Sequence, residues 1–477
     1  MIGPPFVRPP SKCEFPLTIE GFRRIFAIPM YAPFRFLSNA LFSATALMVL
    51  LVSAGLQEEG SRTGDEKPAD ETQEDKGAQE DKGEGGTKYA MLGLPRELVR
   101  YIRMPGGGRH PRSMLDEAGV LHVAFFRAAG SNSKSPSASN GTKEEPDRTE
   151  IGDVFYTSSA DDGATFSEPV RLNAQPAGVL VGRGGTGLSI YESGGAVHVL
   201  MMGSKHAEPR GPEGEDPLLY VRRPAGSESF EAQKNVVDSA WKRGVGVAVI
   251  ADLEGNVHCF FSAENPAAEG QGIWHARSHD GGASFMPEVK ITPEDRGVSM
   301  ASGMDVTIGP NGRIVGSYRS RISKRRDSTM FLSRDKGDSF EVTTTAYTAR
   351  KKDPASATSV TQGATKQYLL LSWEESGEVV WSFLTPLAKS VAYPMMPKVR
   401  PKRYQRSPMA MTNRSIACAI TWIEKVRGEP DDTFRVAWQA WDITGRRPIG
   451  RGITKDSCGG SCPSIFVRSD DGFGILY

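Results

Sequence analysis

An eight-residue pattern with the frame Ser-x-Asp-x-Gly-x-Ser/Thr-Phe occurs three times in the chain. Ser and Asp side chains bond nearby backbone N–H groups and hold a tight turn, while Gly takes a positive φ that a β-carbon would oppose. Runs typical of β-strands precede each copy, so each copy predicts the turn of a β-hairpin. The frame residues are Ser159, Asp161, Gly163 and Phe166, then Ser278, Asp280, Gly282 and Phe285, and finally Ser333, Asp335, Gly337 and Phe340.

A longer pattern, in which a short run, a turn and an apolar run follow one another, is also repeated. It recurs at intervals of about 50 to 60 residues, which fits the four-stranded blades of a β-propeller. Each copy predicts the inner two strands of a blade, and each Ser-x-Asp turn predicts an outer pair. Residues 89–93 and 98–104, which precede the first copy, could supply the outer strands of the last copy and cover an open sheet edge. The seven copies are residues 111–126, 187–202, 245–261, 304–318, 358–373, 409–422 and 463–477.

These repeats predict an all-β fold, a β-propeller of six or seven four-stranded blades, with seven favoured by the count. The frame of the three turns is that of the Asp-box, and from Arg109 to Tyr477 the chain resembles the sialidase (neuraminidase) superfamily with its BNR repeats. Sialidases have six blades, so the count and the resemblance differ on this point. The turns are expected to staple hairpins on the outside of the blades and to take no part in catalysis.

The segment before the repeats predicts export. Residues 1–55 contain an uncharged apolar run at 41–54 that follows three arginines and ends in small residues, as in a secretory signal. The alternative is an uncleaved anchor, since residues 37–56 are about long enough to span a bilayer and would tether the chain to the membrane. Residues 56–88 read as a disordered acidic linker, and residues 89–477 as the propeller domain. The expected location is periplasmic, extracellular or on the cell surface.

Composition and motifs exclude several classes of function. The chain has 58 Lys and Arg against 57 Asp and Glu, so no polyanion partner is expected, and no nucleic-acid or nucleotide motif occurs. Cys458 and Cys462 form the one local cysteine pair, and export favours a small disulfide between them. Cys259 and Cys418 lie in apolar strand patterns and are expected to be buried thiols. No cofactor and no metal site is predicted, because no His lies near the cysteine pair.

Arginines stand before several of the predicted inner strands. Sialidases begin the first inner strand with Phe-Arg-Ile-Pro, whose Arg holds the substrate carboxylate, and the corresponding stretch here is Gly108-Arg109-His110-Pro111. The resemblance therefore implies a carboxylate-binding role for Arg109. Inner strands of a propeller run the same way, so their starts converge on one channel mouth, where arginines would attract an acidic ligand. In the alternative, each is a loop arginine paired with a local carboxylate. The other arginines at this position are Arg183, Arg243 and Arg406, with Arg296 as a looser match.

The resemblance also suggests candidates for catalysis. The sialidase general acid is an Asp before the strand that leads to the first box, and Asp147 lies about one residue from that position. The sialidase nucleophile is a Tyr that opens the last inner strand, where this chain reads Ser461-Cys462-Pro463-Ser464. Tyr404, two residues before Arg406, is the substitute at a comparable strand start, and no Glu partner for it is identified.

Three histidines occupy one position of the longer pattern, three residues after the turn Gly. They are His122, His198 and His258. Equal positions in neighbouring blades are too far apart to share one ion, so these side chains are expected to pack rather than to bind metal.

The sequence thus favours a propeller that binds an acidic glycan or other carboxylate ligand at an arginine-lined channel mouth without full catalytic machinery. One alternative is a glycoside hydrolase of the exo-α-sialidase type, with Asp147 as acid and Tyr404 as nucleophile. Another is a protein–protein interaction scaffold.

Overall fold

The computed structural model describes residues 95, 97–130, 149–182, 185–237, 242–265, 270–293, 297–300, 302–309, 311–321, 328–342, 356–362, 369–375, 378–384, 405–413, 417–426, 429–430, 433–442 and 447–477. Backbone contacts divide the chain into Met1–Gln79 and Glu80–Tyr477, and every described residue belongs to the second unit. The predicted export signal and acidic linker, residues 1–55 and 56–88, therefore lie outside the described residues. Among the described residues, no helix is long and apolar enough to cross a membrane.

The described residues form an all-β fold, as predicted, with seven sheets and one short 3-10 turn, η1 (Pro105–Gly107). The first sheet has β2 (Arg109–Leu115), β3 (Leu121–Ala128), β4 (Glu150–Ser159) and β5 (Val170–Arg171), with β6 (Val179–Val181) paired to β4. The second has β7 (Leu188–Ser193), β8 (Ala196–Met202), β9 (Leu218–Arg223) and β10 (Lys234–Asn235). The third has β11 (Lys242–Ala251), β12 (Val257–Asn265), β13 (Gly270–Ser278) and β14 (Val289–Lys290).

The other four sheets follow in chain order. The fourth has β16 (Met304–Ile308), β17 (Ile314–Arg321), β18 (Ser328–Ser333) and β19 (Glu341–Val342), with β15 (Gly297–Val298) paired to β17. The fifth has β20 (Ser356–Gln362), β21 (Leu369–Glu375) and β22 (Glu378–Leu384). The sixth has β23 (Gln405–Thr412), β24 (Ala417–Lys425), β25 (Phe434–Asp442) and β26 (Pro448–Ile453). The seventh has β27 (Ser464–Val467), β28 (Phe473–Leu476) and β1 (Val99–Ile102).

The second strands of the first and third sheets are buried on both faces. In β3, residues 121–126 are all buried, and in β12 residues 257–263 are all buried. The apolar clusters lie between successive sheets; one of them joins Phe126 and Tyr156 of the first sheet to Val197 and Leu219 of the second. The short β5, by contrast, is exposed at both residues. Burial on both faces explains why these strands read as continuous apolar runs rather than as alternating ones.

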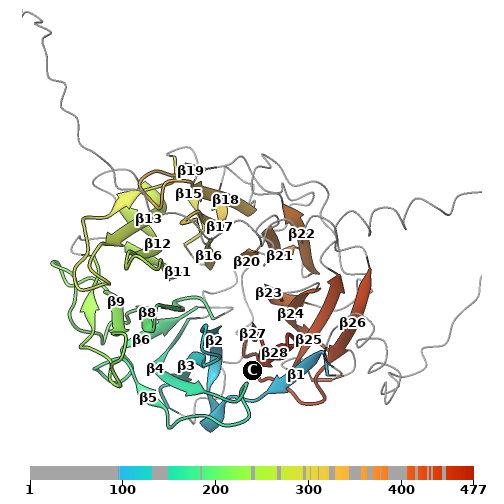
Figure 1. The fold of residues 1–477 in the computed structure, drawn as a ribbon. Helices are drawn as coiled ribbons and strands as arrows, with labels where there is room; N and C mark the ends of the chain where they lie inside the picture. The colour runs from blue at the N-terminus through green and yellow to red at the C-terminus, as the bar shows by residue number, and fades with distance from the viewer. Residues whose placement is uncertain are drawn as a thin grey trace, which may run out of the picture. The chain divides into compact units, whose positions relative to one another are not determined.

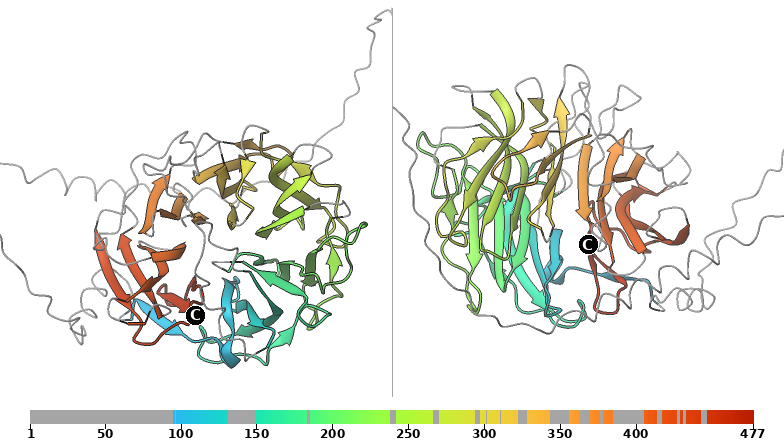
Figure 2. Two further views of the ribbon diagram at one scale, coloured as in Figure 1. Left: turned by 180° about the vertical axis from the view of Figure 1, so that it is seen from behind. Right: turned by 45° about the horizontal axis from the view of Figure 1, so that its top comes forward.

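The first strands of the sheets contact one another in succession. β2 contacts β7, β7 contacts β11, and the series continues through β16, β20, β23 and β27, which in turn contacts β2. Figure 1 shows first strands such as β2, β11, β16 and β20 nearer the middle of the domain than last strands such as β5, β19 and β26, and Figure 2 gives two further views. The first strands of different sheets therefore bring together residues that are far apart in sequence.

The N-terminal strand completes the last sheet. β1 pairs with β28 in parallel, with Val99 opposite Phe473 and Ile102 opposite Leu476. The pairing extends beyond the strand, since the Met104 amide donates to the Tyr477 carbonyl at 3.0 Å. The predicted pairing with the last copy is thus confirmed for residues 98–104, whereas residues 89–93 lie outside the described residues.

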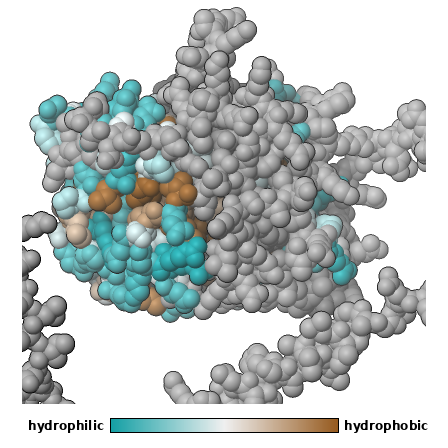
Figure 3. Space-filling view, turned by 90° about the horizontal axis from the view of Figure 1, so that it is seen from above, coloured by the Kyte–Doolittle hydropathy of each residue, from teal (hydrophilic) through white to brown (hydrophobic). Residues whose placement is uncertain are grey.

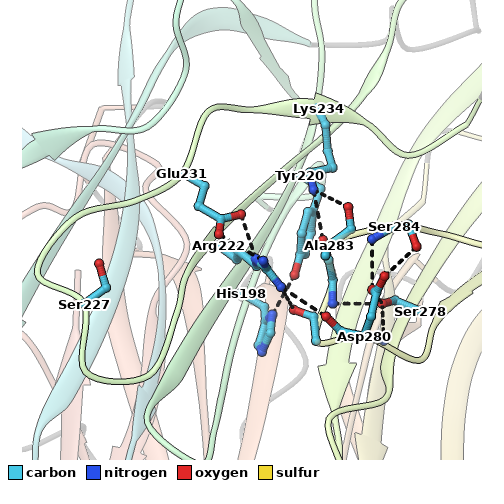
Figure 4. A network of polar contacts seen from close by, with 12 residues as sticks. His198, Tyr220, Arg222, Ser227, Glu231, Lys234, Ser278, Asp280, Ala283 and Ser284 are labelled. Carbon is cyan, nitrogen blue, oxygen red and sulfur yellow. Dashed lines mark hydrogen bonds and ion pairs between the residues drawn. The ribbon is translucent and has the colours of Figure 1, made fainter.

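The three Ser-x-Asp turns share one hydrogen-bond pattern. In the first, the Ser159 hydroxyl donates to Asp161 Oδ1 at 2.7 Å, and the Thr165 amide and hydroxyl donate to the two oxygens of Asp161 at 2.8 and 2.6 Å. The Gly163 amide donates to Ser159 Oγ at 2.8 Å, and φ of Gly163 is 83°. The second turn repeats these bonds, and Figure 4 shows them around Asp280. Each turn connects the third and fourth strands of its sheet, as the predicted hairpins require.

The predicted packing role of the three histidines agrees with the structure. His122 Nδ1 and His198 Nδ1 each lie 2.7 Å from a tyrosine hydroxyl, of Tyr156 and Tyr220 respectively. His258 Nδ1 lies 3.0 Å from Nε2 of His275, and the two rings stack. All three imidazoles are buried between sheets.

Because the Asp carboxylates of the three turns are hydrogen-bonded in the folded state, we expect the fold to lose stability in acid. Hydrogen bonds from Thr165 and Ser339 hold the pKa of Asp161 and of Asp335 at about 2, and bonds from Ser284 lower that of Asp280 further. A carboxylate with a depressed pKa stabilises the fold above its unfolded pKa of about 3.9, and this contribution disappears as pH falls through the folded pKa. We therefore expect the melting temperature to fall between about pH 4 and pH 2, and to fall less over that range in Asp280→Asn.

Thermal melts in this pH range test the prediction. Glu168→Gln, which removes an exposed acid near the first turn, is the control and should follow the wild-type pH dependence. An Asp280→Asn profile parallel to that of the wild type would show that the turn carboxylates do not carry the acid sensitivity.

Candidate functional site

Two first strands begin with the same irregularity. The pairing of β2 with β3 shifts between Arg109 and Arg112, and the pairing of β23 with β24 shifts between Arg406 and Met409. The second residue of each Arg-x-Pro stretch has a positive φ, 53° at His110 and 56° at Ser407. Left-handed conformations of residues other than Gly cost on the order of 1 kcal/mol or more and cluster at functional sites. These two bulges face the same part of the molecule.

A cavity of about 130 Å³ lies among the first strands, next to the bulges. Its walls combine apolar residues such as Val247 and Met304 with polar ones. The polar lining comes from several sheets and includes Arg112, Ser113, Thr186, Ser189, Asp305, Ser407, Cys462 and Ser464. We call this space the axial cavity.

A cysteine, a histidine and a glutamate form a chain of contacts at the axial cavity. The Cys462 amide donates to His110 Nδ1 at 3.2 Å, and the His110 amide donates to Ser461 Oγ at 2.9 Å. His110 Nε2 lies 3.9 Å from Glu150 Oε1, a charge contact rather than a hydrogen bond. Arg109 holds the other oxygen of Glu150 at 2.7 Å. His110 and Cys462 are buried, with 4% and 2% of their surface exposed, and Cys462 lines the cavity.

The pKa of the Cys462 thiol is lowered and that of the His110 imidazole is raised. Burial by itself would raise the pKa of the Cys462 thiol, but the charge and hydrogen bond of His110, a hydrogen bond from Ser407 and the charge of Arg112 outweigh it and lower the pKa to about 7. Burial opposes the charged form of His110, yet Cys462 and Glu150 together raise its pKa. Interaction with His110, and then with Arg109, lowers the pKa of Glu150 despite partial burial. Glu150 is therefore ionised at neutral pH.

The other ends of the first strands surround a wider space of about 680 Å³, lined by turn residues with several carboxylates. Three of these carboxylates accept hydrogen bonds from backbone amides of their own turns. Asp116 accepts from the Val120 amide at 2.7 Å, Glu192 from the Gly195 amide at 2.7 Å, and Asp252 from the Asn256 amide at 2.8 Å. The wider space is therefore lined by acidic groups, whereas arginines lie at the axial cavity and at the two bulged strand starts beside it. We call this part of the domain the bulged end, and it is better matched to an acidic ligand.

Two of the predicted arginines flank one loop, residues 458–462. Arg109 donates to the Gly459 carbonyl at 3.4 Å as well as pairing with Glu150. The Arg406 guanidinium lies over the Phe434 ring, 4.1 Å from its centre, and close to Gly460. Arg243 instead donates to the backbone carbonyls of residues 216 and 237. Arg183, Arg296, Asp147 and Tyr404 lie outside the described residues, so their predicted roles stay predictions.

Arg112, His110, Glu150 and Cys462 were not predicted as site residues. Arg112 is half-buried in the cavity wall and donates to the Gly185 carbonyl at 2.8 Å. Cys462 stands where the sialidase resemblance places the nucleophile, which was the one available signal. The disulfide predicted for Cys458 and Cys462 is not formed: both are free thiols, and Cys458 Sγ donates to the Phe434 carbonyl at 3.2 Å. Cys259 and Cys418 are buried thiols, as predicted.

Figure 3 shows that the described surface on one face of the molecule is largely hydrophilic, with a group of hydrophobic residues within it.

Within the described part of the chain, no group of three or more His, Cys, Asp or Glu side chains is placed to hold a metal ion.

The solved structures named below are distantly similar to this chain. No family model and no curated protein matches. A protein of unknown function from Dyadobacter fermentans is 14% identical, with a TM-score of 0.48 over 72% of this chain and 96% of its own. Trypanosoma rangeli sialidase is 11% identical, with a TM-score of 0.45 over 71% of this chain and 55% of its own. A PL25 ulvan lyase, a polysaccharide lyase, is 11% identical, with a TM-score of 0.46 over 77% and 91%. Since each TM-score is below 0.5, none of these structures assigns a role to a residue here.

Proposed function

We propose that residues 89–477 form a seven-bladed, sialidase-like propeller that binds the carboxylate of a glycan or small acid at the bulged end of the axial cavity. The observation that carries the proposal is the placement of Arg109, Arg112 and Arg406 around the 458–462 loop and the cavity wall. Guanidinium stays charged when buried and can bond both oxygens of a carboxylate. The succession of contacts from β2 round to β27, and the pairing of β1 with β28, support seven blades in a closed ring.

The size of the cavity limits what enters it. A volume of about 130 Å³ is close to that of an engineered cavity of about 150 Å³ that holds benzene. A carboxyl group with a few attached atoms fits this space, whereas a substituted sugar ring does not. A glycan ligand would therefore place its acidic group inside and its ring outside, towards the bulged strand starts.

Titration calorimetry with acetate, glucuronate and sialic acid tests the proposal. Arg112→Gln should weaken binding at least tenfold, because a hydrogen bond to a charged group contributes about 1.5–3 kcal/mol and 1.4 kcal/mol is a factor of ten. Arg171→Gln, in the exposed strand β5, is the matched control and should bind as the wild type does. Equal affinity of Arg112→Gln and the wild type for all three acids would contradict the proposal.

The sialidase-type hydrolase stays an alternative with its own test. Release of a fluorophore from a sialoside reporter, lost in Asp147→Asn and in Tyr404→Phe, would favour it. Carboxylate binding without release favours the binding function. Export, with or without a retained membrane tether, is part of the proposal and is tested by fractionation of cells that express the full chain.

A further inference from the structure

We propose that the axial cavity binds a small amino acid, with its carboxylate on Arg112 and its ammonium group on Asp305. The inference rests on the proposed function, because it takes the carboxylate-binding role of the cavity as its starting point and adds a second charged group to the ligand. The observation that carries it is the pair of opposite charges in the cavity wall.

The charges in the wall match a zwitterion better than an acid. Among the described residues that line the cavity, Arg112 is the one basic side chain and Asp305 the one carboxylate. A plain acid that reached Arg112 would share a space of about 130 Å³ with the carboxylate of Asp305. Like charges repel at such short range, and more strongly where water is excluded. A ligand that also carries a positive charge replaces this repulsion by an attraction.

The two charged side chains come from different sheets. Arg112 lies on β2 of the first sheet, and Asp305 lies on β16 of the fourth. In the succession of contacts among the first strands, β7 and β11 lie between β2 and β16. The two charges therefore approach the cavity from separate directions, and a ligand that lies between them can contact both.

Backbone groups hold both side chains at the cavity. Arg112 donates to the Gly185 carbonyl at 2.8 Å and to the Pro111 carbonyl at 3.4 Å. Asp305 Oδ1 accepts from the Val306 amide at 3.0 Å. Burial lowers the pKa of Arg112, and the negative charge of Asp305 is among the influences that oppose this shift. The two side chains thus affect each other at the cavity, and a ligand that pairs with both preserves the balance of charge.

The size of the cavity limits the amino acid. Alanine has as many non-hydrogen atoms as benzene, which binds in a cavity of about 150 Å³, and the axial cavity has about 130 Å³. Apolar wall residues such as Leu188 and Val247 suit a methyl or methylene group. The hydroxyls of Ser113 and Ser464 lie 2.7 Å apart and bond each other. Small amino acids such as alanine and its isomer β-alanine are therefore the ligand class.

Titration calorimetry with propionate, alanine and β-alanine tests the inference. The two amino acids are propionate with an ammonium group on the first or the second carbon after the carboxylate, so each differs from propionate in one charged group. The wild type should bind at least one of them at least about tenfold more tightly than propionate, which corresponds to about 1.4 kcal/mol. The inference is overturned if neither amino acid binds more tightly than propionate, a result that needs no variant to fold.

Asp305→Asn separates the charge of the side chain from its structural role. Asn keeps an oxygen that can accept from the Val306 amide but removes the charge. The variant should lose the preference for an amino acid and bind propionate at least as tightly as the wild type does, which also shows that it is folded. Glu117→Gln, which removes an exposed carboxylate from the wider space, is the matched control and should keep the preference.

Two outcomes of this comparison contradict the role of Asp305. The preference could survive in Asp305→Asn, as it would if Asp305 only neutralised Arg112 and its loss strengthened the binding of all three ligands alike. The preference could also disappear in Glu117→Gln, which would place the ammonium group in the wider space. Either result overturns the inference.

Binding of propionate keeps the two proposals apart. Propionate binding that depends on Arg112, without preference for an amino acid, overturns the inference and leaves the proposed function standing. If none of the three ligands binds, or if Arg112→Gln binds all of them as the wild type does, the proposed function fails and the inference fails with it.

Discussion

Replacing Gly282 with Ala is expected to lower the free energy of unfolding by about 3–7 kcal/mol. The backbone at Gly282 has a φ of 87°, and a β-carbon there would lie 1.9 Å from the Tyr220 hydroxyl oxygen. That hydroxyl is buried and lies 2.7 Å from His198 Nδ1 (Figure 4). The Tyr220 ring packs edge-on against Phe285, with 5.0 Å between the ring centres. A methyl group must therefore displace a side chain that is fixed on two sides.

The expected cost is the sum of three effects. A left-handed conformation costs Ala on the order of 1 kcal/mol, overpacking costs about 1–3, and a disturbed buried hydrogen bond costs about 1–3. Gly281→Ala is the matched control, because φ at Gly281 is 69° but the nearest atom to its added β-carbon is Arg222 Nη1, at 3.4 Å. The control should lose only about 1 kcal/mol.

Urea denaturation of the two variants measures the difference. Equal losses in both would mean that the turn is sensitive to backbone conformation alone and that its contact with the preceding sheet carries no stability. A larger loss in Gly282→Ala shows that the repeated turn fixes one sheet against the next.

The turn around Gly282 is predictable from the sequence, whereas its contact with Tyr220 is not. The turn itself is local: Ser278, Asp280 and Gly282 lie within five positions, so their pattern predicts the hairpin. The contact of Gly282 with Tyr220 joins residues of different sheets, and nothing local to either residue encodes it. The strand pattern and the pairing of residues 98–104 were predictable, because hydrophobic periodicity and open edges are properties of single segments.

The candidate site was less predictable because it depends on a bulge. Regular alternation would put Arg109 and Pro111 on one face of β2 and the residues between and after them on the other. Alternation alone therefore separates Arg112, which lines the cavity, from Arg109, which pairs with Glu150. The register shift between these two arginines, which includes His110, is the part that alternation does not predict. Cys462 meets His110 across most of the length of the chain. Their contact follows from the proximity of β2 and β27, which no spacing in the sequence reveals.

Replacing Arg468 with Met is expected to lower the free energy of unfolding by about 3 kcal/mol. The side chain is only 1% exposed. Its guanidinium donates to both oxygens of Asp470, at 3.0 and 2.7 Å, and to the Glu97 carbonyl at 2.7 Å. These bonds join the turn between β27 and β28 to the residue that precedes Leu98 and β1. Met keeps much of the apolar volume, so the loss reports the polar contacts rather than a cavity.

Arg100→Met is the matched control, because Arg100 bonds the same Glu97 at 3.0 Å on the surface, with the two side chains 40% and 55% exposed. An exposed ion pair contributes at most about 1 kcal/mol, so the control should be nearly neutral. Hydrogen exchange then shows where stability is lost: in Arg468→Met, the amides of β1 and of Tyr477 should lose protection before those of β24. If all strands lose protection together, the N-terminal strand is not a separately opening unit, and its pairing with β28 is as stable as the rest of the domain. If β1 opens first, Arg468 is the residue that keeps the proposed ring closed, since β1 is the one strand that the last sheet takes from the start of the domain.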